Sequence, residues 1–160
     1  MNLNDISLLL IPSQSSINTI VQRACQLIGN SDKKGGYFCV TDLKGSILLV
    51  MLIGEVAEEK IPRYSKVCIE KAQWLASHAD HVSSWQSRNE AEDKWGGAIK
   101  TKDFIFSFSG LPEMWDEACM VAVAAHFITR DDIHKIDGIS RCSAIYELLG
   151  SLFKSPPDMG

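Results

Sequence analysis

The chain has 160 residues, of which 46% are hydrophobic and 22% are charged, and its formal net charge is -4. This length fits one domain with a core of its own. The negative charge argues against a nucleic-acid-binding surface, which needs clustered Lys and Arg. The apolar segment 46–54 is far shorter than the ~20 residues of a membrane-spanning helix. We therefore expect a cytoplasmic protein with no nucleic-acid partner and no membrane partner.

The N-terminal part of the chain predicts a helix that follows an irregular segment. Residues 1–15 form the expected lead-in, with a short strand at 7–11. Ser16 is a favourable N-cap, and apolar residues follow it at the spacing of one helix face as far as Ile28. Gly29 is a favourable residue to end this helix.

Residues 36–54 predict a β-hairpin. The strand-like segments 36–41 and 46–54 flank a turn that begins with Asp42 and closes with Gly45, two residues typical of such turns. Because the second segment is apolar on both faces, we expect it to be a central strand of the sheet.

A second helix and a long loop are expected next. Pro62 suits the first turn of a helix, and apolar residues at helical spacing continue that helix to about Ala79. The segment 78–95 is polar, which predicts an extended loop with a short helix at 88–94.

The stretch 96–127 predicts a second hairpin and a buried helix. Phenylalanines alternate with other residues over 104–109, the period of a strand, and this strand can pair with 96–101. Gly110 allows a sharp turn. Residues 113–127 are apolar nearly all round and rich in small side chains, which is typical of a helix packed inside the protein.

The C-terminal part predicts one more helix. Residues 129–138 are polar, 139–153 form an amphipathic pattern, and a loose tail begins near residue 155. The expected elements are helix, hairpin, helix, loop, hairpin, helix and helix. This order predicts an α+β domain in which helices pack on one antiparallel sheet.

The five cysteines are widely spaced, and four of them lie within apolar patterns. No pair has the close spacing of a zinc or redox motif. We therefore expect buried, reduced thiols.

An ordered set of short motifs runs through the chain. It consists of Val40-Thr41-Asp42 with Gly45, of Lys71-Ala72 with Trp74-Leu75-Ala76, and of Gly96-Gly97, Ser109-Gly110 and Asp116-Glu117-Ala118. In this order and spacing the motifs resemble those of the GlcG/HbpS-like family, the haem-degrading or haem-binding domain also found at the C-terminus of PduO-type proteins.

The resemblance covers about residues 16–127 and carries several implications. It implies a profilin-like fold and a homo-oligomer, and some relatives bind haem or another tetrapyrrole. It divides the chain into a lead-in at 1–15, a GlcG/HbpS-like domain at 16–130, and a C-terminal helical extension and tail at 131–160.

The resemblance also places a small ligand near the Lys71 helix and the Ser109-Gly110 turn. The expected ligand-binding residues are Lys71, Ser109, Gly110, Asp116, His78 and Arg63. Lys71 either pairs with a ligand carboxylate such as a propionate or lies with its amine at the surface, and Arg63 has a weaker version of the same role.

His78 and His81 are three residues apart at a predicted helix end. One interpretation is a shared metal or an axial haem ligand. The other is that both complement the negative end of the helix. His126 and His134 are interpreted as structural.

Acidic residues crowd the first turns of the helix that begins near Glu113. We expect Glu113, Asp116 and Glu117 to stabilise its positive end, with Asp116 also bonded to the turn at 109–110. Their side chains diverge, so they do not form the facing pair of carboxyl groups that catalysis needs. We assign no catalytic residue.

Two classes of function remain open from the sequence. The first is a non-catalytic, oligomeric protein that binds a small ligand, with haem or a related tetrapyrrole as the leading candidate. The second is a protein-interaction scaffold of profilin-like or roadblock-like fold that binds its partner through residues 139–153. An enzyme is the third interpretation.

Overall fold

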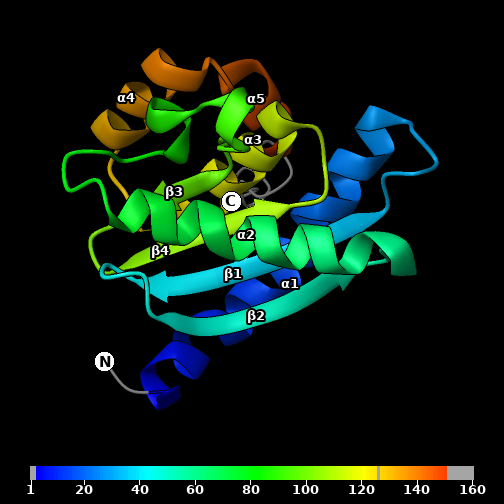
Figure 1. Ribbon diagram of the computed structural model, residues 1–160, viewed down its shortest axis with the longest axis horizontal. Helices are drawn as coiled ribbons and strands as arrows, with labels where there is room; N and C mark the ends of the chain where they lie inside the picture. The colour runs from blue at the N-terminus through cyan, green and yellow to red at the C-terminus, as the bar shows by residue number, and fades with distance from the viewer. Residues whose placement is uncertain (1–2, 126, 151–160) are drawn as a thin grey trace, which may run out of the picture.

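The computed structural model describes residues 3–125 and 127–150, and its centre is one antiparallel sheet (Figure 1). The strand order is β2-β1-β4-β3. The strands are β1 (Gly35–Asp42), β2 (Ile47–Gly54), β3 (Ala98–Lys100) and β4 (Phe104–Ser109). Both predicted hairpins are confirmed, because β1 pairs with β2 and β3 pairs with β4.

Helices cover both faces of this sheet, which confirms the predicted α+β class (Figure 1). One face carries α1 and α3, the other carries α2, and the last two helices pack beside α3. The helices are α1 (Leu3–Ile28), α2 (Ile61–Ala76), α3 (Glu113–Ala124), α4 (Arg130–Ser140) and α5 (Ser143–Gly150). Short 3-10 turns lie at Glu58–Lys60, Ser84–Ser87 and Glu90–Glu92.

The β1–β2 turn forms for the local reasons that predicted it. Asp42 Oδ1 accepts hydrogen bonds of 2.9 Å from the backbone N–H of both Lys44 and Ser46. Gly45 closes the turn with a φ of 87°, a conformation that favours glycine. The side chain of Asp42 therefore fixes the turn from its first residue.

The predicted central position of segment 46–54 is wrong. This segment forms β2, which lies at the edge of the sheet and pairs only with β1 among the described strands. Its side chains are mostly half-buried or exposed, and Ile47 and Leu52 are 48% and 47% exposed. An apolar run indicates a strand without charged side chains, but it does not indicate how many other strands pair with it.

The N-terminal helix begins earlier than predicted. Instead of an irregular segment with a strand at 7–11 and an N-cap at Ser16, α1 begins at Leu3 and continues through Pro12. Leu3, Ile6 and Leu10 recur at helical spacing, which favours this earlier start. The end at Ile28 is confirmed, with Gly29 next at a φ of 68°.

The C-terminal region contains two helices where one was predicted. Thr129 and Asp132 cap α4 reciprocally, since Asp132 N–H donates to Thr129 Oγ1 and Thr129 N–H donates to Asp132 Oδ2. Arg141, at a φ of 57°, separates α4 from α5. The part of the predicted helix beyond residue 150 and the tail near 155 lie outside the described residues, as does His126.

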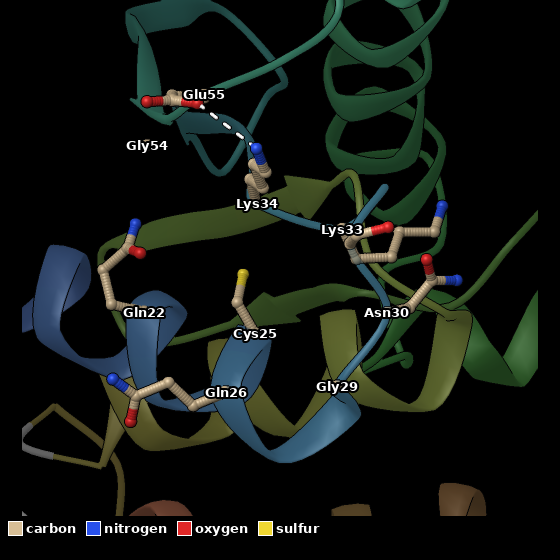
Figure 2. Close-up of a pocket in the computed structure, with 10 residues that line it drawn as sticks. Gln22, Cys25, Gln26, Gly29, Asn30, Lys33, Lys34, Gly54 and Glu55 are labelled. Atoms are coloured by element: carbon tan, nitrogen blue, oxygen red, sulfur yellow. Dashed lines mark ion pairs between the residues drawn. The ribbon is translucent and has the colours of Figure 1, made fainter.

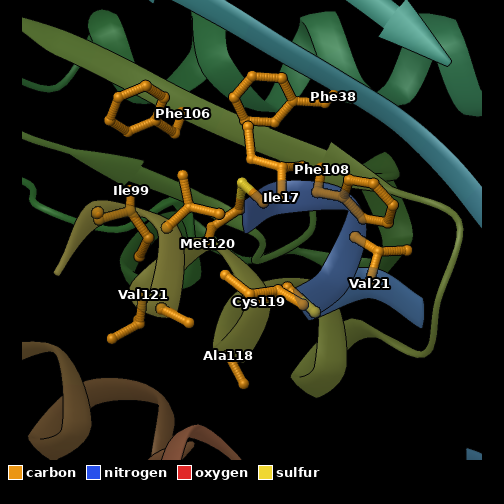
Figure 3. Packing of buried hydrophobic residues seen from close by; sticks show 14 of the residues in the cluster. Ile17, Val21, Phe38, Ile99, Phe106, Phe108, Ala118, Cys119, Met120 and Val121 are labelled. Carbon is orange, nitrogen blue, oxygen red and sulfur yellow. The ribbon is translucent and has the colours of Figure 1, made fainter. Parts of the chain in front are cut away.

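The larger core cluster lies between the sheet and the pair α1 and α3 (Figure 3). Phe38, Phe106 and Phe108 point from the sheet toward Ile17 and Met120. Residues of α4 and α5 belong to the same cluster. The C-terminal helices are therefore packed into the core of the domain, while the division of the chain at residues 15 and 130 stays a prediction.

A smaller cluster lies between the sheet and α2. It consists of Cys39, Cys68, Ala72, Leu75, Ala98 and Ile105. These mostly small side chains let the helix approach the strands closely. All five cysteines are free thiols and four are buried, as the sequence predicts. No helix within the described ranges is long and apolar enough to cross a bilayer.

Candidate functional site

A cavity of about 200 Å³ lies between α2, the end of β4 and the start of α3. Five of the six predicted ligand-binding residues line it: Arg63, Lys71, Ser109, Gly110 and Asp116. The rest of its lining consists of Tyr64, Val67, Trp95, Leu111 and Glu113. We call it the α2–α3 cavity. Residues from distant parts of the sequence therefore meet at one place.

Lys71 and Asp116 form a buried ion pair at this cavity. Lys71 Nζ lies 3.1 Å from Asp116 Oδ2 and donates a 2.7 Å hydrogen bond to the carbonyl of Phe108. Asp116 Oδ1 accepts from Leu111 N–H at 3.0 Å, just beyond the predicted Ser109-Gly110 turn. Both side chains are 4% exposed. Lys71 therefore binds a protein carboxylate and does not place its amine at the surface, while its contact with a ligand stays a prediction.

The buried carboxyl groups of α3 have raised pKa values. Burial raises the pKa of Asp116 to about 6, although the neighbouring Lys71 ammonium opposes this shift. Burial likewise raises the pKa of Glu117 to about 7. Glu117 accepts hydrogen bonds from Ser83 Oγ at 2.6 Å and from Gly97 N–H at 2.9 Å. These bonds only partly offset the loss of water around its carboxyl group.

Glu113 and Asp116 lie in the first turn of α3, at the positive helix end where the prediction placed them, but their hydrogen bonds go to other segments. Pro112 is the N-cap of α3 and no side chain caps that end. The three carboxylates instead bind backbone N–H groups of other segments: Glu113 that of Gly96 at 2.7 Å, Asp116 that of Leu111, and Glu117 that of Gly97. The bonds of Glu113 and Glu117 join the start of α3 to Gly96 and Gly97, a contact that the spacing in the sequence does not reveal.

Arg63 lies at the exposed rim of the cavity, with 58% of its side chain accessible. Its Nη1 and Nη2 donate to the two carboxylate oxygens of Asp93 at 3.0 and 2.8 Å. Asp93 Oδ1 also accepts from Trp95 Nε1 at 2.6 Å. The Arg63 guanidinium and this second donor hold the pKa of Asp93 well below its usual range. A guanidinium has five N–H donors, so Arg63 keeps donors for a further acceptor.

His78 lies outside the α2–α3 cavity, at the C-terminal end of α2. Its Nδ1 is 2.8 Å from the carbonyl of Trp74 in the last turn, and its ring stacks on that of His81, with centroids 4.6 Å apart. Burial and the neighbouring His78 lower the pKa of His81. Within residues 3–125 and 127–150 no group of three or more His, Cys, Asp or Glu could hold a metal ion. The geometry therefore fits the helix-end interpretation.

A second, open cavity of about 630 Å³ was not predicted from the sequence (Figure 2). It lies between the end of α1, the loop that follows it and the end of β2, and its lining includes Cys25, Lys33 and Lys34. Lys34 forms a long ion pair of 3.9 Å with Glu55. Lys33 Nζ donates to the hydroxyl of Tyr64 at 3.2 Å, so this contact joins the walls of the two cavities.

Gly97 allows a close approach that a larger residue would prevent. A Cβ there would lie 2.7 Å from Lys71 Nζ and 3.0 Å from Asp116 Cβ, and its φ is 113°. We expect Gly97→Ala to lower the free energy of unfolding by at least about 2 kcal/mol. Gly138→Ala is the control, because nothing lies within 4 Å of its Cβ position in α4, and it should stabilise by about 0.5–1 kcal/mol. Urea unfolding of both variants measures this, and equal effects would contradict the prediction.

Each charged side chain that lines the α2–α3 cavity has an opposite charge beside it. The ion pairs are Lys71 with Asp116, Arg63 with Asp93, and Glu113 with Arg88. Ser109 lines the cavity, but both oxygens of the nearby Asp116 already accept hydrogen bonds. Asp116 is therefore not available as a base that would activate the Ser109 hydroxyl.

Comparisons with known proteins give one structural similarity. No protein-family model matches the sequence, and no curated protein matches it. Among solved structures, the chain is similar to the crystal structure of Klebsiella pneumoniae protein ORFY, of family DUF336. The identity is 14% and the TM-score 0.49, over 79% of this chain and 90% of ORFY.

Proposed function

We propose that this chain is a non-catalytic, GlcG/HbpS-like protein that binds a small ligand at the α2–α3 cavity and assembles with copies of itself. One observation carries the proposal: five residues selected from the sequence as ligand contacts line a single cavity. The family resemblance in the sequence supplies the ligand class, haem or a related tetrapyrrole.

The size of the cavity limits what it encloses. Pockets that enclose drug-sized ligands measure about 300–1,000 Å³, whereas this cavity measures about 200 Å³. It therefore accepts a compact polar molecule or one polar edge of a larger molecule. A tetrapyrrole fits this description if a propionate enters the cavity and the macrocycle stays outside it.

Arg63 is the cation that a ligand carboxylate can reach. Lys71 is buried and already bound to Asp116, so its displacement would leave a buried charge without a partner. Arg63 is exposed and keeps N–H donors beyond those bound to Asp93. Of the two residues predicted to bind a ligand carboxylate, Arg63 therefore contacts it, and Lys71 stabilises the cavity wall through Asp116.

Haemin titration of the purified protein tests this function. We expect a shift of the Soret band, and about tenfold weaker binding in Arg63→Ala, because a charge-assisted hydrogen bond is lost. Lys66→Ala is the matched control on the same helix, since Lys66 is exposed and does not line the cavity. His78→Ala should also bind normally. An absent Soret shift, or equal affinity in Arg63→Ala, would contradict the proposal.

The scaffold function remains as a second candidate, but not through residues 139–153. In the described part of that segment, Ile145, Tyr146 and Leu149 pack against the main core, so this face is not available to a partner. The observation that favours an interaction function is a different one, the exposed apolar strand β2.

A further inference from the structure

The two edges of the sheet differ in how they are protected. At the β3 edge, Ser83 forms a bridge with Ile99, and Lys100 N–H donates to the carbonyl of Val82 at 2.8 Å. At the β2 edge, no backbone hydrogen bond of the described residues joins Ile47–Ile53 to any strand other than β1. An edge strand carries unpaired N–H and C=O groups that can pair with another strand.

The sequence of β2 lacks the usual protection of an open edge. Natural edge strands carry charges, especially Lys, or proline, which prevent pairing with other chains. Strand β2 reads ILLVMLIG, with no charged residue and no proline. A neutral strand of this kind meets a second copy of itself without like-charge repulsion.

One face of β2 also lacks a covering helix. Register with β1 places Ile47, Val50 and Leu52 on the face that carries α2, opposite Thr41, Cys39 and Tyr37. Helix α2 crosses β1, β3 and β4, and leaves the β2 side of this face uncovered (Figure 1). The exposed fractions of Ile47 and Leu52, given above, follow from this position.

A bulge in β2 limits the registers available for self-pairing. The register of β1 with β2 shifts between Val40 and Thr41, so β2 is regular only from Leu49 onward. In an antiparallel pair of copies centred on Met51, Leu49 faces the second copy's Ile53, and Val50 faces its Leu52. In this register, residues that face each other lie on the same face of the sheet. A pair centred on Val50 would place the bulged Leu48 opposite Leu52, on opposite faces.

We propose that the chain forms a two-fold symmetric dimer through antiparallel pairing of β2 with β2 of a second copy, centred on Met51. The inference rests on the self-assembly part of the proposed function and is independent of its ligand part. The joined sheet has eight strands, and both of its outer edges are β3 edges closed by residues 82–84. Assembly therefore stops at the dimer, as a closed two-fold contact requires.

The position of the N-terminal helix favours a second copy of the chain, and not a short peptide, as the partner that pairs with β2. The first turns of α1 extend past β2 at the lower left of Figure 1. A second copy seated on β2 brings a sheet and helix layer alongside these turns. A dimer thus buries more than the strand edge, as a stable interface of about 800 Å² per partner needs.

Cysteine pairs test the interface and its register. In a Cys25→Ser background, which removes the partly exposed native thiol, Val50→Cys and Leu52→Cys are purified separately and mixed. Facing residues have Cα atoms about 4.5–5.5 Å apart, within disulfide range. Two copies of residue 50, or two of residue 52, lie about 8 Å apart, beyond that range. We expect a disulfide dimer on a non-reducing gel only from the mixture.

A mass measurement provides the second readout. Sedimentation should give twice the 17.7 kDa of the single chain, and Leu52→Lys should halve that mass. Leu148→Lys is the matched control, because Leu148 is 51% exposed on α5, far from β2. Leu148→Cys mixed with Val50→Cys should likewise give no disulfide dimer.

Each contrary result has its own meaning. A monomer at all concentrations overturns both the β2 dimer and the proposed self-assembly. A dimer that forms no disulfide in the mixture, or that Leu52→Lys leaves intact, overturns the β2 interface alone. A disulfide dimer from Val50→Cys by itself overturns the register. Haemin binding is measured separately and tests only the ligand function.

Discussion

Replacement of Lys71 by methionine is expected to lower the free energy of unfolding by about 3–5 kcal/mol at pH 8. Methionine keeps most of the volume of the lysine chain but leaves the Asp116 carboxylate buried without its cation. It also removes the donor to the carbonyl of Phe108. Urea unfolding monitored by tryptophan fluorescence measures the change.

A double variant separates the lost ion pair from the lost volume. Lys71→Met with Asp116→Asn removes both charges, and the new side-chain amide still offers an oxygen to Leu111 N–H. We expect this double variant to be more stable than Lys71→Met alone by about 2 kcal/mol. Lys66→Met on the same helix, where the side chain is 72% exposed, should change stability by less than about 1 kcal/mol. Equal losses in Lys71→Met and the double variant would show that the charge of Asp116 is not the cause.

The second large effect is a fall in stability with rising pH, caused by Glu117. Its pKa is raised to about 7 in the folded chain, from a usual value of 4.5. The folded state therefore binds more protons than the unfolded state between these pH values, and the free energy of unfolding decreases as pH rises through this window. The contribution of Glu117 is at most about 3 kcal/mol. The raised pKa of Asp116 acts in the same direction.

Glu117→Gln tests the origin of this pH dependence. Glutamine is neutral at every pH and keeps an oxygen for Gly97 N–H. We expect the variant to match the wild type near pH 5, to exceed its stability at pH 8, and to show a flatter profile. His81 has a lowered pKa and contributes the opposite slope below pH 6.5. The difference between wild type and Glu117→Gln removes that contribution, and a difference that does not change with pH would refute the assignment.

Ser83→Ala supplies the complementary measurement. It keeps the carboxyl group but removes the hydroxyl that donates to it at 2.6 Å. Loss of a donor to the charged form raises the pKa further. The fall in stability should then extend to higher pH than in the wild type, whereas a purely structural effect of Ser83 would lower stability equally at all pH values.

The carboxyl groups of Asp116 and Glu117 also explain why the acidic start of α3 occurs together with Gly96-Gly97. Asp116 and Glu117 hold the backbone at Leu111 and Gly97, on either side of β4 in the sequence. Gly97 in turn leaves room for Lys71 Nζ. Lys71, Gly97, Asp116 and Glu117, four of the motif residues that resemble those of the GlcG/HbpS-like family, thus form one buried network beside the α2–α3 cavity.

The elements that could be predicted from the sequence are those with a local cause. The β1–β2 turn depends on Asp42 and Gly45, which act within four residues. The strand period at 104–109 and the apolar surface of α3 likewise follow from the pattern of neighbouring residues. Even α4 has a local signal, the reciprocal cap of Thr129 and Asp132, which sequence reasoning overlooked.

The features that could not be predicted depend on partners distant in the chain. Lys71 and Asp116 are 45 residues apart, and they form an ion pair only because the fold brings α2 and the start of α3 together at the end of β4. Glu117 is fully buried where Ser83 and Gly97 from other segments contact it, and this burial raises its pKa. Strand β2 lies at the edge because β4 pairs with the other side of β1 and not with β2. Local patterns therefore determine which elements form, whereas the charge state of the site and the open edge follow from how those elements pack.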